Sequence, residues 1–171
     1  MRFLVDAHSG AENRLLVSYL RFWRGCSQPR GGGRQEMGRI RVLVADDHEA
    51  MLERVAELVK TEYDVVGTAT DGQQVLDAAR ELKPDVLVLD ISMPVMNGIE
   101  TAHHLKEAGA ETRIVFLTVH DDPDFAREAL EAGALGYVIK QRIASDLMIA
   151  INEVCAGRSF VSPLSPPQAI S

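Results

Sequence analysis

From residue 40 onward, short runs of branched aliphatic residues alternate with segments whose apolar residues recur every three or four positions. The short runs are bounded by turn residues and have the length of strands, whereas the segments between them have the periodicity of helices. Uninterrupted apolar runs are typical of parallel strands buried on both faces. We therefore expect an α/β fold with a doubly wound, five-stranded parallel sheet, built from five βα repeats. The predicted strands are residues 40–45, 65–69, 86–89, 114–117 and 136–139.

Capping and turn residues predict where the helices begin and end. Asp122 followed by Pro123 predicts the start of a helix that Gly133 ends, since aspartate favours the cap and proline the first turn. Ser145 is expected to cap the last helix, which ends at Gly157. The other helices are expected around residues 51–59, over 72–82, and from the loop at 93–98 to about residue 107.

The chain divides into three parts by composition. Residues 39–157 carry the regular pattern and form the predicted folded domain. Residues 1–38 hold six arginines and three consecutive glycines, and we expect a disordered extension there. An amphipathic membrane-surface or partner helix over residues 14–24 is the alternative for that part. Residues 158–171 are rich in proline and are predicted to be a linker-like tail.

The charge and the cysteine content narrow the class of protein. The formal net charge is −7, from 18 basic and 25 acidic residues, which argues against general nucleic-acid binding. The apolar runs are too short to span a membrane, and the first ten residues lack the form of a signal peptide. Two distant cysteines provide neither a disulfide framework nor zinc-ligand spacing, so we expect a reducing, cytoplasmic location.

Carboxylates follow two of the predicted strands. Asp46 and Asp47 close the first strand, and Asp90 closes the third. Ligands bind at the carboxyl edge of such sheets, and three carboxylates crowded there are costly unless a cation lies among them. The pattern therefore indicates a site for a hard metal ion with one carboxylate exposed for chemistry. The alternative for Asp46 and Asp47 is a helix cap and a first-turn acid.

Two more polar residues follow the remaining strands: Thr118 comes after the fourth and Lys140 after the fifth. An acidic pair, a single aspartate, a hydroxyl and a lysine in this order resemble the receiver domain of bacterial two-component response regulators. The loop motif Asp90, Pro94 and Gly98 resembles the same family. The resemblance covers about residues 39–157 and implies a flavodoxin-like fold.

The resemblance implies that Asp90 accepts a phosphoryl group from a sensor histidine kinase or a phosphotransfer protein. It also implies that Mg²⁺ is bound directly by Asp47 and Asp90, through water by Asp46, and by the backbone carbonyl of Ser92. Oxygen ligands of this kind suit Mg²⁺, which keeps several waters.

Three further roles follow from the resemblance. Lys140 would neutralise charge on the transferring oxygens, which is most of what catalysis of phosphoryl transfer needs. Thr118 would move inward to bond a phosphoryl oxygen. Tyr137 would swing inward with it and change the surface that an output partner contacts. The alternatives are a solvated lysine, a threonine that merely favours a strand, and a half-exposed strand tyrosine.

Gln141 stands directly after the lysine, where many receiver domains place proline. With the sequence around residues 136–139 and 157–163, this resembles the NarL/FixJ subfamily, whose members usually continue into a helix-turn-helix domain. The chain stops at Ser171 without such a domain. We therefore expect that the chain does not bind nucleic acid directly. It is expected to be either a stand-alone receiver or the receiver part of a truncated transcription regulator. The output partner is unknown, and a homodimer is one option.

A phosphoaspartate hydrolase is the rival from another class. Such enzymes also use an aspartate at a strand end with Mg²⁺, and resemble each other in a second aspartate two residues later. That position is Ser92 here, which lacks the acid needed for the leaving group. We therefore expect that the chain is not an enzyme and that it catalyses at most its own phosphorylation and dephosphorylation.

Overall fold

One parallel sheet runs through the computed structural model, which describes residues 39–164. In that part of the chain the sheet has six strands in the order β2-β1-β3-β4-β5-β6, and each neighbouring pair is parallel. The strand order reverses between β1 and β3, so the expected doubly wound fold is confirmed. The strands are β1 Arg41–Ala45, β2 Asp64–Ala69, β3 Val86–Asp90, β4 Arg113–Thr118, β5 Gly136–Ile139 and β6 Phe160–Val161. The expected extension at residues 1–38 lies outside the described residues.

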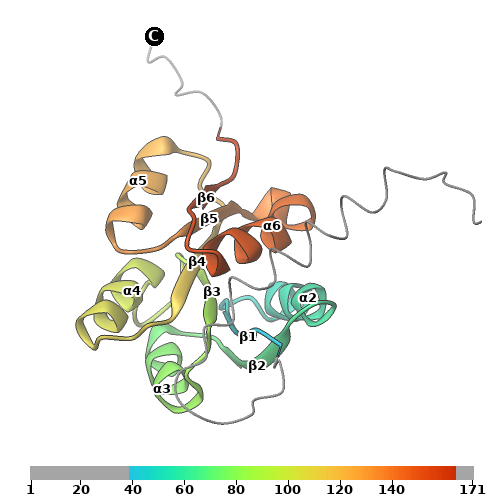
Figure 1. Cartoon of the computed structure of the whole chain (residues 1–171). Coiled ribbons are helices and arrows are strands. Elements are labelled where there is room, and N and C mark those ends of the chain that lie inside the picture. The colour runs from blue at the N-terminus through green and yellow to red at the C-terminus, as the bar shows by residue number, and fades with distance from the viewer. Residues whose placement is uncertain (1–38, 165–171) are drawn as a thin grey trace, which may run out of the picture. The chain divides into compact units, whose positions relative to one another are not determined.

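Helices cover both faces of this sheet. In Figure 1, α3, α4 and α5 lie on one side of the strands and α2 and α6 on the other. A short 3₁₀ turn, η1 (Lys140–Arg142), joins β5 to α6. The α-helices of the described residues are α2 Glu49–Lys60, α3 Gly72–Leu82, α4 Gly98–Glu107, α5 Pro123–Glu131 and α6 Ile143–Cys155.

The central strand β3 is buried along its whole length. Successive strand residues point to opposite faces, so Leu87 and Leu89 pack in the cluster formed with α3, α4 and α5. Val86 and Val88 lie on the opposite face, the one covered by α2 and α6. Covering both faces explains why the strand reads as an uninterrupted apolar run.

The helix starts follow local side-chain chemistry in most cases. The carboxylate of Asp122 accepts a hydrogen bond from the amide of Asp124, with Pro123 in the first turn, as predicted. The expectation that Ser145 caps α6 is wrong, because η1 leads directly into a helix that begins at Ile143. Ser145 lies inside α6, where its hydroxyl donates to the carboxylate of Asp146.

The sheet has one strand more than the five that were predicted. Residues 160–161, expected to belong to a linker-like tail, form β6 beside β5. The amide of Phe160 donates to the carbonyl of Leu135 at 2.9 Å, and the amide of Ser162 donates to that of Tyr137 at 2.8 Å. A strand this short has no detectable period in the sequence, and the prolines that follow it favour a loop.

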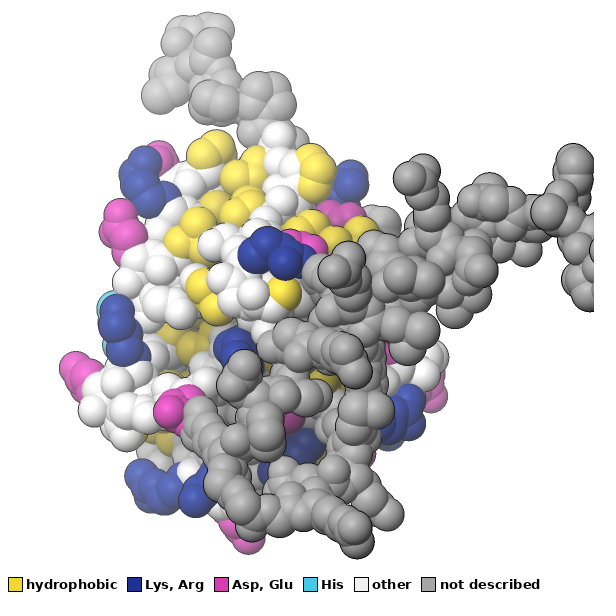
Figure 2. Space-filling model, in the orientation of Figure 1, with side chains coloured by type: hydrophobic (Ala, Val, Ile, Leu, Met, Phe, Trp, Pro, Cys, Tyr) yellow, Lys and Arg dark blue, Asp and Glu magenta, His cyan; other side chains and the backbone are white. Residues whose placement is uncertain are grey.

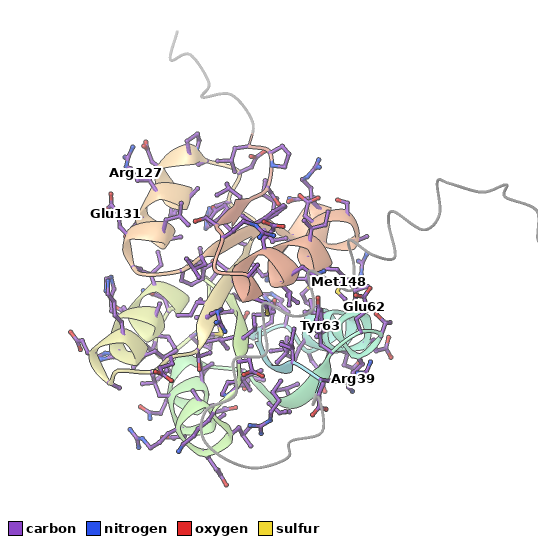
Figure 3. All side chains as sticks on the ribbon, viewed as in Figure 1. Arg39, Glu62, Tyr63, Arg127, Glu131 and Met148 are labelled. Atoms are coloured by element: carbon purple, nitrogen blue, oxygen red, sulfur yellow. The ribbon has the colours of Figure 1, made fainter. Side chains whose placement is uncertain are left out.

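Side-chain contacts and exposed apolar residues mark the surface around α6. Tyr63, labelled in Figure 3, follows α2 and donates its hydroxyl to Oδ1 of Asn152 in α6 at 2.8 Å. Figure 2 shows hydrophobic side chains gathered around the β6 and α6 end of this face. Ile149 of α6 and Val161 of β6 are exposed. Among the described residues, no helix combines the length and the apolar character needed to cross a bilayer.

Candidate functional site

The register of the sheet brings the ends of β1, β3, β4 and β5 to one edge. Ala45 pairs with Leu89, and in the next ladders Asp90 pairs with Leu117 and Thr118 with Ile139. The residues at or just after these ends are therefore neighbours, although they are far apart in the sequence. They are Asp46, Asp90, Thr118 and Lys140, four of the residues that the sequence predicted for the site.

Lys140 joins the two buried carboxylates of this edge. Its ammonium nitrogen lies 2.7 Å from Oδ2 of Asp46 and 3.0 Å from Oδ2 of Asp90. The Asp46 side chain is fully buried, that of Asp90 is 3% exposed, and that of Lys140 is 10% exposed. The lysine is therefore not a solvated surface residue, which was the alternative for it.

Two negative charges and one positive charge leave this buried cluster with an excess of one negative charge. Burial raises the pKa of Asp90, and the neighbouring charge of Asp46 raises it too. The hydrogen bond and charge of Lys140 and the backbone amide of Ser92 counter this only in part. Burial lowers the pKa of Lys140, but its two carboxylate partners outweigh burial and raise it. The ammonium is thus firmly charged, whereas ionised Asp90 is short of a countercharge.

The acidic side chains at this edge form a donor set that fits a hard cation. One ligand atom each from Asp46, Asp47, His48 and Asp90 lies within 4.8 Å of the others. Oδ2 of Asp46 is buried and makes no hydrogen bond of good geometry, although it faces the Lys140 ammonium. Carboxylate oxygens are the ligands that Mg²⁺ prefers. The residues present therefore fit the expected metal, and the individual ligand roles remain predictions.

His48 follows the acidic pair and holds its geometry. The His48 amide donates to Oδ1 of Asp46 at 3.0 Å, and its ring Nδ1 lies 2.8 Å from Oδ1 of Asp47. The carboxylate of Asp47 is 26% exposed and lies at the mouth of the site. The alternative of a helix cap and a first-turn acid is wrong for Asp46 and Asp47, because the N-cap of α2 is His48 and the acid of its first turn is Glu49. Oδ1 of Asp46 accepts the His48 amide, and its Oδ2 faces Lys140.

The loop after β3 is pressed closely against Asp90. A Cβ at Gly98 would lie 2.2 Å from the carbonyl oxygen of Asp90, so only glycine fits there. Asn97 caps α4 through a reciprocal capping box with Glu100. Ser92 is exposed, and its backbone amide faces the Asp90 carboxylate. The predicted role of the Ser92 carbonyl as a metal ligand stays a prediction.

Thr118 and Tyr137 are both fully buried beside the site. The hydroxyl oxygen of Thr118 accepts the amide of His120 at 3.1 Å, and the hydroxyl of Tyr137 donates to the His120 carbonyl at 2.8 Å. Burial, with the charge of Asp122 next, raises the pKa of Tyr137 to about 12. The alternative of a half-exposed strand tyrosine is therefore wrong, because α5 and the loop before it cover this side of β5.

One buried cluster near the site was not predicted. The buried residues Asp146 and Ser162 and the exposed Arg142 belong to the segments that follow Lys140 and β6, and Arg142 and Ser162 both donate hydrogen bonds to the Asp146 carboxylate. An arginine four residues before an aspartate is a helix-surface pair in sequence terms, and carries no sign of burial. The contribution of Ser162 depends on β6, which the sequence did not predict.

Known proteins resemble this chain over the same region. Residues 42–152 match the family described as response regulator receiver domain. Transcriptional regulatory protein DegU from Brevibacillus brevis is 30% identical over 127 residues, which are 73% of this chain and 54% of that protein. Nitrate/nitrite response regulator protein NarL from Escherichia coli is 36% identical over 128 residues, which are 74% of this chain and 59% of that protein.

A solved structure supports the same relationship. The crystal structure of a LuxR-family two-component response regulator from Aurantimonas sp. SI85-9A1 superposes with a TM-score of 0.69 at 36% identity, covering 72% of this chain and 89% of that chain. The match therefore includes the fold as well as the sequence. The chain spans little more than half the length of the two curated relatives.

Proposed function

This chain belongs to the response regulator receiver family, and we propose that Asp90 is its phosphoacceptor, phosphorylated by a sensor histidine kinase or a phosphotransfer protein. The observation that carries the proposal is that Lys140 forms ion pairs with two buried carboxylates, those of Asp46 and Asp90. Of the two, Asp90 lies at the end of the central strand. The raised pKa of Asp90 at the edge of the sheet where ligands bind supports the same assignment, because perturbed pKa values cluster at functional sites. The arrangement suits a site that binds a metal cation and then a phosphoryl group.

The chemistry proposed for Asp90 is a nucleophilic displacement. A carboxylate oxygen attacks the phosphorus of a phosphohistidine, an oxygen–phosphorus bond forms, and the phosphorus–nitrogen bond breaks. The electron pair of that bond stays on the imidazole, which takes up a proton. Lys140 is already charged and 3.0 Å from Asp90, so it stabilises negative charge on the transferring oxygens without rearrangement.

The metal proposed for the site is Mg²⁺. Asp47 and Asp90 would hold it directly, Asp46 through water, and the Ser92 carbonyl would complete the protein ligands. When bound, Mg²⁺ supplies the positive charge that offsets the carboxylates and the phosphoryl oxygens. His48 keeps the Asp47 carboxylate at the mouth of the site and Asp46 against Lys140.

The readout proposed for phosphorylation involves Thr118 and Tyr137. In the structure the Thr118 hydroxyl accepts the His120 amide, and a shift toward Asp90 would exchange that bond for one to a phosphoryl oxygen. The same loop is held by Tyr137 through the His120 carbonyl. A change at Asp90 would thereby reach the loop between β4 and α5, in which Val119 is exposed.

The experiment uses a small phosphodonor such as acetyl phosphate with Mg²⁺, and intact-mass measurement of the full chain. We expect one phosphoryl group on the wild type and none on Asp90→Asn. The control is Asp64→Asn, which removes an exposed carboxylate on β2 and should be phosphorylated at the wild-type rate. Phosphorylation of Asp90→Asn at the wild-type rate would refute the assignment.

A second candidate function is the control of transcription. DegU is named as a transcriptional regulatory protein, and this chain matches 54% of its length. In that reading, the chain is the receiver part of a DNA-binding regulator, and phosphorylation of Asp90 regulates transcription through the rest of it. The isolated chain should then fail to shift DNA in a gel, since a net charge of −7 disfavours general binding to DNA.

The remaining expectations concern partners and location. We propose a phosphodonor protein and a separate output partner, with a homodimer as one mode of assembly, in the cytoplasm. The site would act on its own phosphoryl group and on no exogenous phosphoester, because Ser92 replaces the second carboxylate of the hydrolases. A turnover assay with a phosphoester substrate checks this.

A further inference from the structure

A buried carboxylate beside the site ties together three segments of the chain. Asp146, 4% exposed, accepts hydrogen bonds from Nε of Arg142 at 2.8 Å and from the hydroxyl of Ser162 at 2.7 Å, both on Oδ2. Its other oxygen accepts the hydroxyl of Ser145 at 2.6 Å. Burial raises the pKa of Asp146, but these three partners outweigh it and lower the pKa. The Asp146 carboxylate is thus ionised and holds its three hydrogen-bond partners in place.

Ser162 links the Asp146 carboxylate to β5 through hydrogen bonds. Its hydroxyl oxygen accepts the amide of Ile139 at 3.3 Å, and its own amide donates to the carbonyl of Tyr137 at 2.8 Å. Ser162 is 1% exposed, so no water competes for these bonds. Figure 1 shows β6 beside β5, with α6 packed next to them. One serine therefore connects the last residue of β5 to a carboxylate of α6.

Lys140 lies between the two attachment points of this network. Ile139, immediately before it, is held by Ser162, and Arg142, two residues after it, is held by Asp146. The backbone turns here from β5 into η1, and Gln141 follows the lysine, so no proline ring restricts the turn. A lysine has a long flexible stem, so the place of its ammonium depends on where this backbone is held.

We propose that Ser162, acting through Asp146 and the amide of Ile139, is a positioning residue for Lys140. It sets the distance of the ammonium from Asp90 and thereby the rate at which Asp90 is phosphorylated. The inference rests on the proposed function, since a rate exists only if Asp90 is the phosphoacceptor. It also assigns β6 a role, because the pairing of β6 with β5 holds Ser162 next to Tyr137 and Ile139.

The test compares Ser162→Ala with a matched control in the full chain. The control is Thr112→Val, which removes a hydroxyl that donates to the Pro84 carbonyl at 2.9 Å. Thr112 comes just before β4, so it lies at the edge of the sheet opposite to Lys140. With acetyl phosphate and Mg²⁺, Ser162→Ala should be phosphorylated about three- to tenfold more slowly, in the range typical of coupled positions. Thr112→Val should stay within about twofold of the wild type. Asp146→Asn keeps the side chain's shape and should slow phosphorylation to the same extent as Ser162→Ala. It replaces Ser162→Ala in the test if that variant folds poorly.

A double-mutant cycle separates positioning from general destabilisation. In a Lys140→Ala background, the residual rate should change by less than about 1.5-fold on adding Ser162→Ala, because the residue it positions is gone. An equal loss with and without Lys140 would overturn the inference, as would a wild-type rate for both Ser162→Ala and Asp146→Asn. Absence of phosphorylation in the wild type would instead contradict the proposed function, so the two failures are distinguishable.

Discussion

The ammonium nitrogen of Lys140 lies 3.0 Å from Oδ2 of Asp90, and both side chains are largely buried. The same nitrogen lies 2.7 Å from Asp46, so one cation serves two carboxylates. A buried cluster with unequal charges stores electrostatic free energy that a ligand of suitable charge releases. The stability of the fold should therefore respond to each member of the cluster in a predictable direction.

Removal of the lysine should destabilise the fold and make it dependent on metal. Lys140→Ala leaves two buried carboxylates without their cation, which we expect to lower the free energy of unfolding by about 3 kcal/mol. Added Mg²⁺ should restore part of this loss, because it brings positive charge to the same oxygens. Urea unfolding with and without Mg²⁺ measures both effects. A Lys140→Ala variant that is as stable as the wild type without metal would contradict the ion pairs described here.

Replacement of the central carboxylate should have the opposite effect. The pKa of Asp90 is raised above its ordinary value of 3.8, so its contribution to stability is greatest below that pH and is lost as pH rises through the raised value. Near pH 7, Asp90→Asn should be more stable than the wild type by about 1 kcal/mol. Well below pH 3.8, the difference should disappear, because Asp90 is then protonated and neutral in the folded and in the unfolded state.

Thermal unfolding at several pH values checks this, with Asp64→Asn as the matched control. Asp64 is exposed on β2, so its replacement should change the free energy of unfolding by less than about 0.5 kcal/mol at each pH. An Asp90→Asn variant that is less stable than the wild type near pH 7 would mean that Lys140 dominates the environment of Asp90.

The sequence was sufficient to bring Asp46, Asp90 and Lys140 to one edge. Each follows an apolar run, and parallel strands must end at the same edge whatever else the fold does. The charges alone then imply that the three groups meet. Tyr137 shows what the sequence could not supply: its exposure depends on α5 and the loop at His120, which lie against it only in the folded chain.

Ser162 illustrates a different limit. Its role depends on β6, whose two residues carry no periodic signal and whose pairing with β5 is decided by tertiary contacts. The sequence also did not predict the backbone conformation of Val95. Its φ of 68° follows from the path that the loop must take between Asp90 and Gly98, and valine is a poor choice for such a conformation on local grounds.

The loop after Asp90 holds a strained residue whose replacement should stabilise the protein. Val95 is 87% exposed, so its side chain gains little from packing, while a left-handed conformation costs a β-branched residue about 1–2 kcal/mol. Asparagine tolerates this conformation, and Val95→Asn should raise the free energy of unfolding by about 1 kcal/mol. Val119→Asn, at an exposed valine without a positive φ, should be neutral within about 0.5 kcal/mol. Equal effects of the two substitutions in urea unfolding would argue against strain at Val95.

The buried phenol of Tyr137 should give the fold a distinct sensitivity to alkaline pH. Its pKa is raised from 10.0 to about 12, so the stability it contributes is fully present below pH 10 and is lost as pH rises toward 12. Tyr137→Phe lacks this ionisation and should be about 1 kcal/mol less stable than the wild type near pH 8, because the His120 carbonyl loses its donor. Between pH 10 and 12 the wild type should lose on the order of 2 kcal/mol more than the variant, so the gap narrows and then reverses. Chemical unfolding of both proteins across this range measures the difference directly, since other groups titrate in both. A gap that stays constant with pH would mean that the phenol reaches solvent in the folded protein.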